Sequence, residues 1–214
     1  MMALVFDYMR ERSELAEAPI DGLGDRQALQ RALDGLISAE PKDAREVLGV
    51  YVDALSTTIL SADSPRYFAF IPAAPTEAAT MFDMVVSSAS LQGCSWLEAA
   101  GAVAAENQAL RVLADLAGMP PTSGGVFVSG GSAGNLSALV VARDKARQDR
   151  MAAGVSPARG RVVVSDQAHS SISSALNIVD LDALIVPTPD GRLDGESLRR
   201  GLADEDLSDV LPIV

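Results

Sequence analysis

The clearest pattern of apolar and polar positions lies in residues 124–145, GGVFVSGGSAGNLSALVVARDK. A short β-prone run, Val126–Val128, precedes the turn Ser129–Ser132, and apolar residues then recur at helical spacing from Leu136 onward. The pattern predicts a strand, a glycine turn and a helix in immediate succession. Such a turn exposes backbone N–H groups at a helix start, with the Ser132 hydroxyl expected at the N-cap. It therefore predicts an anion site, for which a phosphate is the natural occupant.

Three chemistries use a turn of this kind. A dinucleotide site needs G-x-G-x-x-G, but the glycines here are Gly130, Gly131 and Gly134. A nucleotide P-loop needs a lysine where Asn135 stands. The turn does satisfy G-x-S-x-G, the nucleophile elbow of serine hydrolases, with Ser132 as the nucleophile. A serine hydrolase therefore stays open as the alternative function, beside a glycine turn that only packs a helix close to a sheet.

Downstream of this stretch, the pattern alternates between strands and helices. We expect strands at 161–165, at 183–186 and from 210 to the end, with helices up to Leu176 and over 196–202. The alternation predicts an α/β fold, a three-layer α/β/α domain with a mainly parallel sheet. The apolar run that reaches the last residue favours a truncated domain.

Upstream, helices predominate. The first 60 residues predict two or three helices with narrow apolar faces, and further helices are expected over 76–92 and 99–117. Since the first of these segments has no obvious core, we expect it to pack on the next domain or on a second subunit, which favours a homodimer. We place a helical, dimerising segment at 1–90 and the first part of the α/β domain at 91–214.

An aromatic segment, SPRYFAFIP, occupies residues 64–72. Pro65 and Pro72 predict an extended loop from which the aromatic side chains project. Two interpretations are open for it: the wall of a substrate pocket, or aromatic packing at a domain junction.

Composition and net charge limit the cellular compartment and the kinds of binding partner that we expect. A formal net charge of −12 argues against nucleic acid or an anionic membrane as a partner. The single Cys94 forms no internal disulfide, and neither a signal peptide nor a membrane-spanning apolar run is evident. We expect a cytoplasmic protein, and the sequence suggests no metal site.

Four segments together resemble a known family. The chain is similar to the fold-type I, group II pyridoxal-5′-phosphate-dependent decarboxylases, which act on amino acids such as aromatic amino acids, glutamate, histidine and diaminobutyrate. The resemblance covers most of the chain from about residue 64 onward. Its segments are SPRYFAFIP (64–72), FVSGGSAGNLSAL (127–139), SDQAHSSISSAL (165–176) and VPTPDGRLDGESLRRGL (186–202).

The resemblance implies a pyridoxal 5′-phosphate (PLP) cofactor, an amino acid substrate and roles for particular residues. Gly131 and Ser132 would hold the cofactor phosphate. His169, the one histidine of the chain, would stack on the pyridine ring and assist proton handling. The substrate side chain would face four residues of the aromatic segment: Phe70, Ile71, Pro72 and Ala73.

The chain departs from the family at two groups that the PLP chemistry needs. A lysine must form a Schiff base with the cofactor, and an aspartate must pair with the pyridine nitrogen. The chain has only two lysines, Lys42 and Lys145, and Lys145 is expected roughly 20 Å from the phosphate end of its helix. In relatives both groups follow the point that corresponds to Val214. The resemblance is therefore to the N-terminal portion of a decarboxylase, a lyase when complete, and we expect the 214-residue chain alone to be inactive.

The hydrolase alternative would pair Ser132 with His169 as its base. Candidate orienting carboxylates are Asp144, Asp149 and Asp166, but no H-G-G-type oxyanion loop precedes the turn. The choice among amino acid substrates is not readable from these residues.

Overall fold

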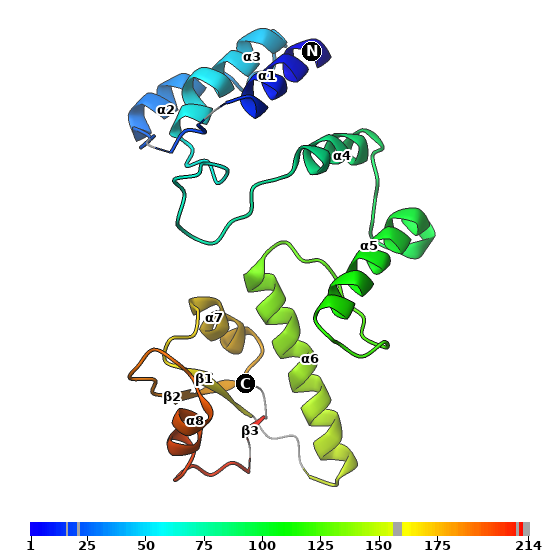
Figure 1. Ribbon diagram of the computed structural model, residues 1–214, viewed down its shortest axis with the longest axis vertical. Coiled ribbons are helices and arrows are strands. Elements are labelled where there is room, and N and C mark those ends of the chain that lie inside the picture. The colour runs from blue at the N-terminus through cyan, green and yellow to red at the C-terminus, as the bar shows by residue number, and fades with distance from the viewer. Residues whose placement is uncertain (16, 21, 156–159, 209, 212–214) are drawn as a thin grey trace. The chain divides into compact units, whose positions relative to one another are not determined.

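The computed structural model describes residues 1–15, 17–20, 22–155, 160–208 and 210–211. The chain forms two packing units, Met1–Ala99 and Ala100–Val214 (Figure 1). The domain boundary expected near residue 90 stays a prediction, because a division by packing does not test where a fold-level domain begins. Within the described ranges, every helix is too short or too polar to cross a membrane.

The first unit is helical, as predicted, and polar caps fix where its helices begin. The side chains of Asp25, Asp43 and Thr76 accept hydrogen bonds from backbone N–H groups in the first turns of three helices. The helices are α1 (Met2–Ser13), α2 (Arg26–Leu33), α3 (Ala44–Val50), which continues as the π-helical turn η1 (Tyr51–Leu55) and the 3-10 turn η2 (Ser56–Thr58), and α4 (Glu77–Ser88). The helix α5 (Trp96–Leu116) spans the division and leaves helical geometry at Ala99, with φ −146° and ψ 52°.

The aromatic segment departs from the extended loop that the two prolines predict. It is not helical, but the backbone enters the left-handed region at Phe70 (φ 58°) and Ile71 (φ 51°). That region is unusual for a β-branched residue, and it turns the chain where an extended backbone would run straight. Both side chains are exposed, Phe70 by 89% and Ile71 fully.

The second unit confirms the predicted alternation of strands and helices. Its elements after α5 are α6 (Gly131–Ala152), β1 (Arg161–Ser165), α7 (Ser170–Ile178), β2 (Asp182–Val186), α8 (Gly195–Gly201) and β3 (Val210–Leu211). The strands form a parallel sheet in the order β2-β1-β3, with Arg161 opposite both Asp182 and Val210. Residues 212–214, which were expected to continue the last strand, lie outside the described residues.

The strand predicted at Val126–Val128 is wrong. The described structure shows no strand there, and the Phe127 N–H donates to the carboxylate of Glu106 at 3.1 Å. An apolar, β-prone run becomes a strand only where a neighbouring strand satisfies its backbone groups. Here a side chain on α5 takes one of those bonds.

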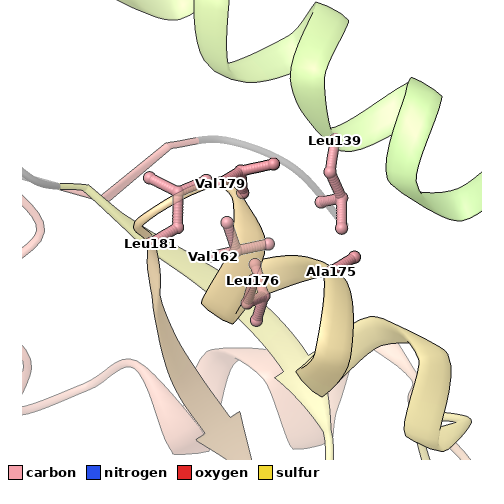
Figure 2. Close-up of a cluster of buried hydrophobic side chains, with 6 residues drawn as sticks. All are labelled: Leu139, Val162, Ala175, Leu176, Val179 and Leu181. Atoms are coloured by element: carbon pink, nitrogen blue, oxygen red, sulfur yellow. The ribbon is translucent and has the colours of Figure 1, made fainter.

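Successive residues of β1 build the two layers around the sheet. Val162 is 1% exposed and packs with Leu139 of α6 and with Ala175 and Leu176 of α7 (Figure 2). The next residue, Val163, points to the other face and packs with Val186 and with Leu198 of α8. Because side chains alternate along a strand, one valine run supplies both cores, and the three-layer prediction is confirmed (Figure 1).

Candidate functional site

The glycine turn leads into the 22-residue helix α6, whose first turn carries no side-chain cap. Helical bonding starts with the Gly134 N–H donating to the Gly130 carbonyl at 3.1 Å, so Gly130 is the N-cap. The prediction of Ser132 as N-cap is therefore wrong, because Ser132 already lies inside the first turn. An N-cap without a side chain leaves the leading N–H groups available at the positive end of the helix dipole. Gly131 and Ser132 are both exposed there.

The segment Asp166–Ser171 follows the carboxyl end of β1. Asp166 ties this segment to the end of β2, because its carboxylate accepts hydrogen bonds from the Thr188 N–H, at 3.2 Å, and from the Thr188 hydroxyl. Both bonds lower the pKa of Asp166 below its ordinary value, and the bond from the Thr188 hydroxyl contributes most. The Ser165 hydroxyl adds a bond from the Gln167 N–H at 2.9 Å. The loop that carries His169 is thus fixed at both of the strands that it adjoins.

His169 is exposed and serves as the N-cap of α7. Its Nδ1 accepts from the Ser171 N–H at 3.2 Å and lies 2.9 Å from the Ser171 hydroxyl oxygen. That hydroxyl in turn accepts from the side-chain amide of Asn135 on α6, at 2.9 Å. A chain of hydrogen bonds therefore joins the helix of the glycine turn to the imidazole.

The two helix starts border one open hollow of about 410 Å³. The structure thus brings together two of the residues that were assigned to the cofactor, Ser132 and His169. Other side chains of its wall are Ala133, Leu136, Ser171, Ser174 and Ile178. Apolar and hydroxyl groups side by side suit a flat, partly polar ring with an anionic substituent.

Other residues that were assigned from the sequence lie elsewhere. The four substrate-facing candidates Phe70, Ile71, Pro72 and Ala73 belong to the first unit, as does Lys42. Lys145 lies on α6, where its exposed ammonium group pairs with Asp149 at 2.5 Å. The hydrolase alternative finds no support: among the hydrogen bonds of the described residues, none joins Ser132 to His169, whose Nδ1 is bonded to Ser171.

Sequence reasoning missed Asn135, Ser171, Asp166 and Thr188 as parts of this site. Asn135 excluded a P-loop and lies in the segment 127–139 of the family resemblance, but no contact was predicted for it. Asp166 was a possible hydrolase carboxylate and lies in the segment 165–176 of the family resemblance, but no role in the cofactor site was assigned to it. No spacing pattern signals the Asn135–Ser171 bond, because its partners are 36 residues apart and meet only when α6 packs on α7.

The parallel sheet with helices on both faces defines a class of α/β folds, and solved structures share this fold. The chain superposes on tryptophan decarboxylase of Catharanthus roseus in complex with L-tryptophan with a TM-score of 0.80 and 19% identity. That match covers 95% of this chain and 46% of the other. TDC of Oryza sativa with PLP and tryptamine gives a TM-score of 0.76 and 22% identity, over 94% and 46% of the two chains. The fold is that of the fold-type I decarboxylases.

The family follows from the sequence comparison. The model of the pyridoxal-dependent decarboxylase conserved domain matches residues 27–214, and the chain belongs to this family. It is 29% identical to aromatic-L-amino-acid decarboxylase of Bacillus atrophaeus, over 82% of this chain and 35% of that protein. It is 32% identical to a glutamate decarboxylase-like protein of Gibberella zeae, over 79% and 32%. The chain thus spans about a third of the length of these two relatives.

The residues present fit the family's cofactor. An uncapped helix start suits a phosphate, and the exposed imidazole lines the same hollow. The comparisons give no support to the expectation that the Schiff-base lysine is missing, which remains a prediction.

Proposed function

We propose that this chain forms part of a PLP-dependent L-amino acid decarboxylase and contributes the phosphate-binding turn and the histidine beside the ring. The observation that carries the proposal is the convergence of the uncapped first turn of α6 and His169 on one hollow. The family match and the shared fold support it.

Each residue has a stated task in this proposal. The backbone N–H groups of Gly131 and Ser132, with the Ser132 hydroxyl, would hold the phosphate at the positive end of α6. His169 would face the ring of the cofactor, and its Nε2 would exchange a proton with the amino acid substrate. The bound cofactor supplies the electron sink that loss of carbon dioxide requires. The hollow that these residues border would hold the cofactor.

The phosphate site is tested by comparing the binding of PLP with that of pyridoxal, which lacks the phosphate. We expect roughly ten-fold tighter binding of PLP to the native chain, because the helix start interacts with the phosphate alone. Ser132→Asp should abolish this preference, since its carboxylate repels the phosphate while suiting the helix start. Ser137→Asp is the matched control: Ser137 is exposed on the same helix and its hydroxyl bonds the Ala133 carbonyl at 2.8 Å. Equal binding of the two ligands to the native chain would overturn the proposal.

The covalent anchor is tested by borohydride reduction in the presence of PLP, followed by mass spectrometry. We expect no stoichiometric adduct at Lys42 or Lys145. Specific labelling of either lysine would show that the active site lies elsewhere.

The catalytic role of His169 is tested in the native protein that carries these residues, by carbon dioxide release from a panel of L-amino acids. We expect His169→Ala to lower kcat by about 10²–10⁴-fold, the usual contribution of a positioned proton donor. A variant with unchanged kcat would exclude this role.

The remaining parts of the proposal concern the first unit. We propose that Phe70, Ile71, Pro72 and Ala73 contact the substrate side chain, because all four are exposed and apolar side chains this exposed favour an apolar partner. We also propose that the protein is a cytoplasmic homodimer, in which a second copy covers the exposed apolar side chains of the helices of the first unit. Light scattering of the purified protein tests the dimer, and a monomer at micromolar concentration would contradict it.

A further inference from the structure

The hydrogen bonds around His169 specify which of its nitrogens carries the proton. A backbone N–H can only donate, so the bond from the Ser171 N–H at 3.2 Å requires Nδ1 to be an acceptor. A neutral imidazole whose Nδ1 accepts must carry its proton on Nε2. The Ser171 hydroxyl, 2.9 Å from the same Nδ1, must then donate to it as well.

Asn135 determines where the Ser171 hydroxyl sends its proton. The amide nitrogen of Asn135 donates to the hydroxyl oxygen at 2.9 Å, which leaves the hydroxyl hydrogen free to point at His169. Ser171 is 8% exposed and Asn135 is half-buried, so solvent competes little for these bonds. The ring nitrogen Nε2 has no hydrogen-bond partner among the described residues, and the ring lines the open hollow.

We propose that Asn135 and Ser171 are positioning residues that hold neutral His169 in the Nε2–H tautomer. The imidazole then presents a single N–H donor to whatever occupies the hollow, and its orientation is tied to the helix that carries the glycine turn. The inference rests on the proposed function for its purpose, because a donor at Nε2 can hold a substrate carboxylate or return a proton after carbon dioxide leaves. The tautomer itself is a property of the chain without any ligand.

The tautomer can be measured directly, because His169 is the only histidine. We would record long-range 1H–15N correlation spectra of the ring in the full chain at about pH 9, where an imidazole is neutral. For the native chain we expect a protonated-type shift at Nε2 and an unprotonated-type shift at Nδ1. Averaged shifts at both nitrogens, or a proton on Nδ1, would overturn the proposal without any variant.

Two substitutions test whether the hydrogen bonds from Asn135 to Ser171 and from Ser171 to His169, here called the relay, set the tautomer, or whether packing alone does. Asn135→Asp keeps the shape but can only accept, so it draws the Ser171 proton away from His169, and Ser171→Ala removes that hydroxyl. Each should change the ratio of tautomers roughly five-fold towards Nδ1–H, which corresponds to the loss of one ordinary hydrogen bond. Ser170→Ala is the matched control, an exposed serine one residue away in the same hollow, and should leave the spectrum unchanged.

The outcomes separate the relay from the proposed function. If Asn135→Asp and Ser171→Ala fold, as their backbone amide spectra report, and both keep the native tautomer, the relay is wrong whatever the cofactor does. If one of them fails to fold, the other decides the question. If the relay holds but PLP binds no better than pyridoxal, the proposed function fails and the tautomer assignment stands.

Discussion

The two units of the chain differ in where their apolar residues are buried. In the second unit, Val162 and Val186 are 1% and 0% exposed, and each belongs to a core between the sheet and a helix layer. In the first unit, Leu23, Ile37 and Ile71 are at least 95% exposed. Both units expose large apolar side chains, but among the described residues the only buried hydrophobic residues of the first unit are Ala18 and Ala99. The second unit therefore has apolar cores of its own, whereas the described part of the first unit has no comparable core.

The largest expected effect comes from truncating a leucine in each unit. Leu176→Ala should lower the free energy of unfolding by about 2–5 kcal/mol, because Leu176 is 3% exposed and its removal leaves a cavity beside Val162. Leu23→Ala should change it by less than about 0.5 kcal/mol, because Leu23 is 95% exposed. Urea unfolding followed by circular dichroism, with amide exchange of β1 as a local probe, measures both. Equal losses would erase the contrast between the units.

A second comparison adds one methyl group to a glycine in each unit. A Cβ at Gly201 would lie 2.8 Å from Val186 Cγ1, so Gly201→Ala should destabilise by about 1–3 kcal/mol through overpacking. At Gly49, within α3, the nearest atom is 4.0 Å away. Gly49→Ala should therefore stabilise by about 0.5–1 kcal/mol, since alanine favours the helix. Melting temperatures that move in the same direction for both variants would contradict this prediction.

The smallest expected effect is a dependence of stability on pH that both units share. Asp63 of the first unit has its pKa lowered, chiefly by a hydrogen bond from Arg12, and Asp166 of the second has its pKa lowered by Thr188. A carboxyl whose folded pKa lies below its unfolded value of 3.8 stabilises the fold above that value. This contribution is lost as the pH falls through the folded pKa.

Melting temperature measured against pH tests both carboxylates. Asp63→Asn and Asp166→Asn should each flatten the acid limb of the curve, and Asp166→Asn should also change the exchange of amides at the end of β1. The prediction would fail if the acid limb were as steep in the variants as in the native chain.

The local sequence pattern predicted the strands and helices of the second unit well, but it predicted the residues of the candidate site only in part. The boundaries of β1 were read correctly from the valine run at 161–165, since apolar runs of that length bury on both faces. The strand at Val126–Val128 and the cap at Ser132 were wrong, because each depends on which backbone partner is present. The Asn135–Ser171 bond was not predictable, because it exists only where two helices pack.

The strand order carries a consequence of its own. From β1 the chain crosses to β2 on one side through α7, and from β2 it returns past β1 to β3 on the other side through α8. Connections between parallel strands are right-handed, so two connections that run in opposite directions along the sheet place their helices on opposite faces. The two cores agree, since α7 packs on one face and α8 on the other. The sheet therefore has a topological switch point between β1 and β3, and His169 follows the carboxyl end of β1 beside it. The strand order, independently of any sequence motif, therefore determines where His169 lies relative to the sheet.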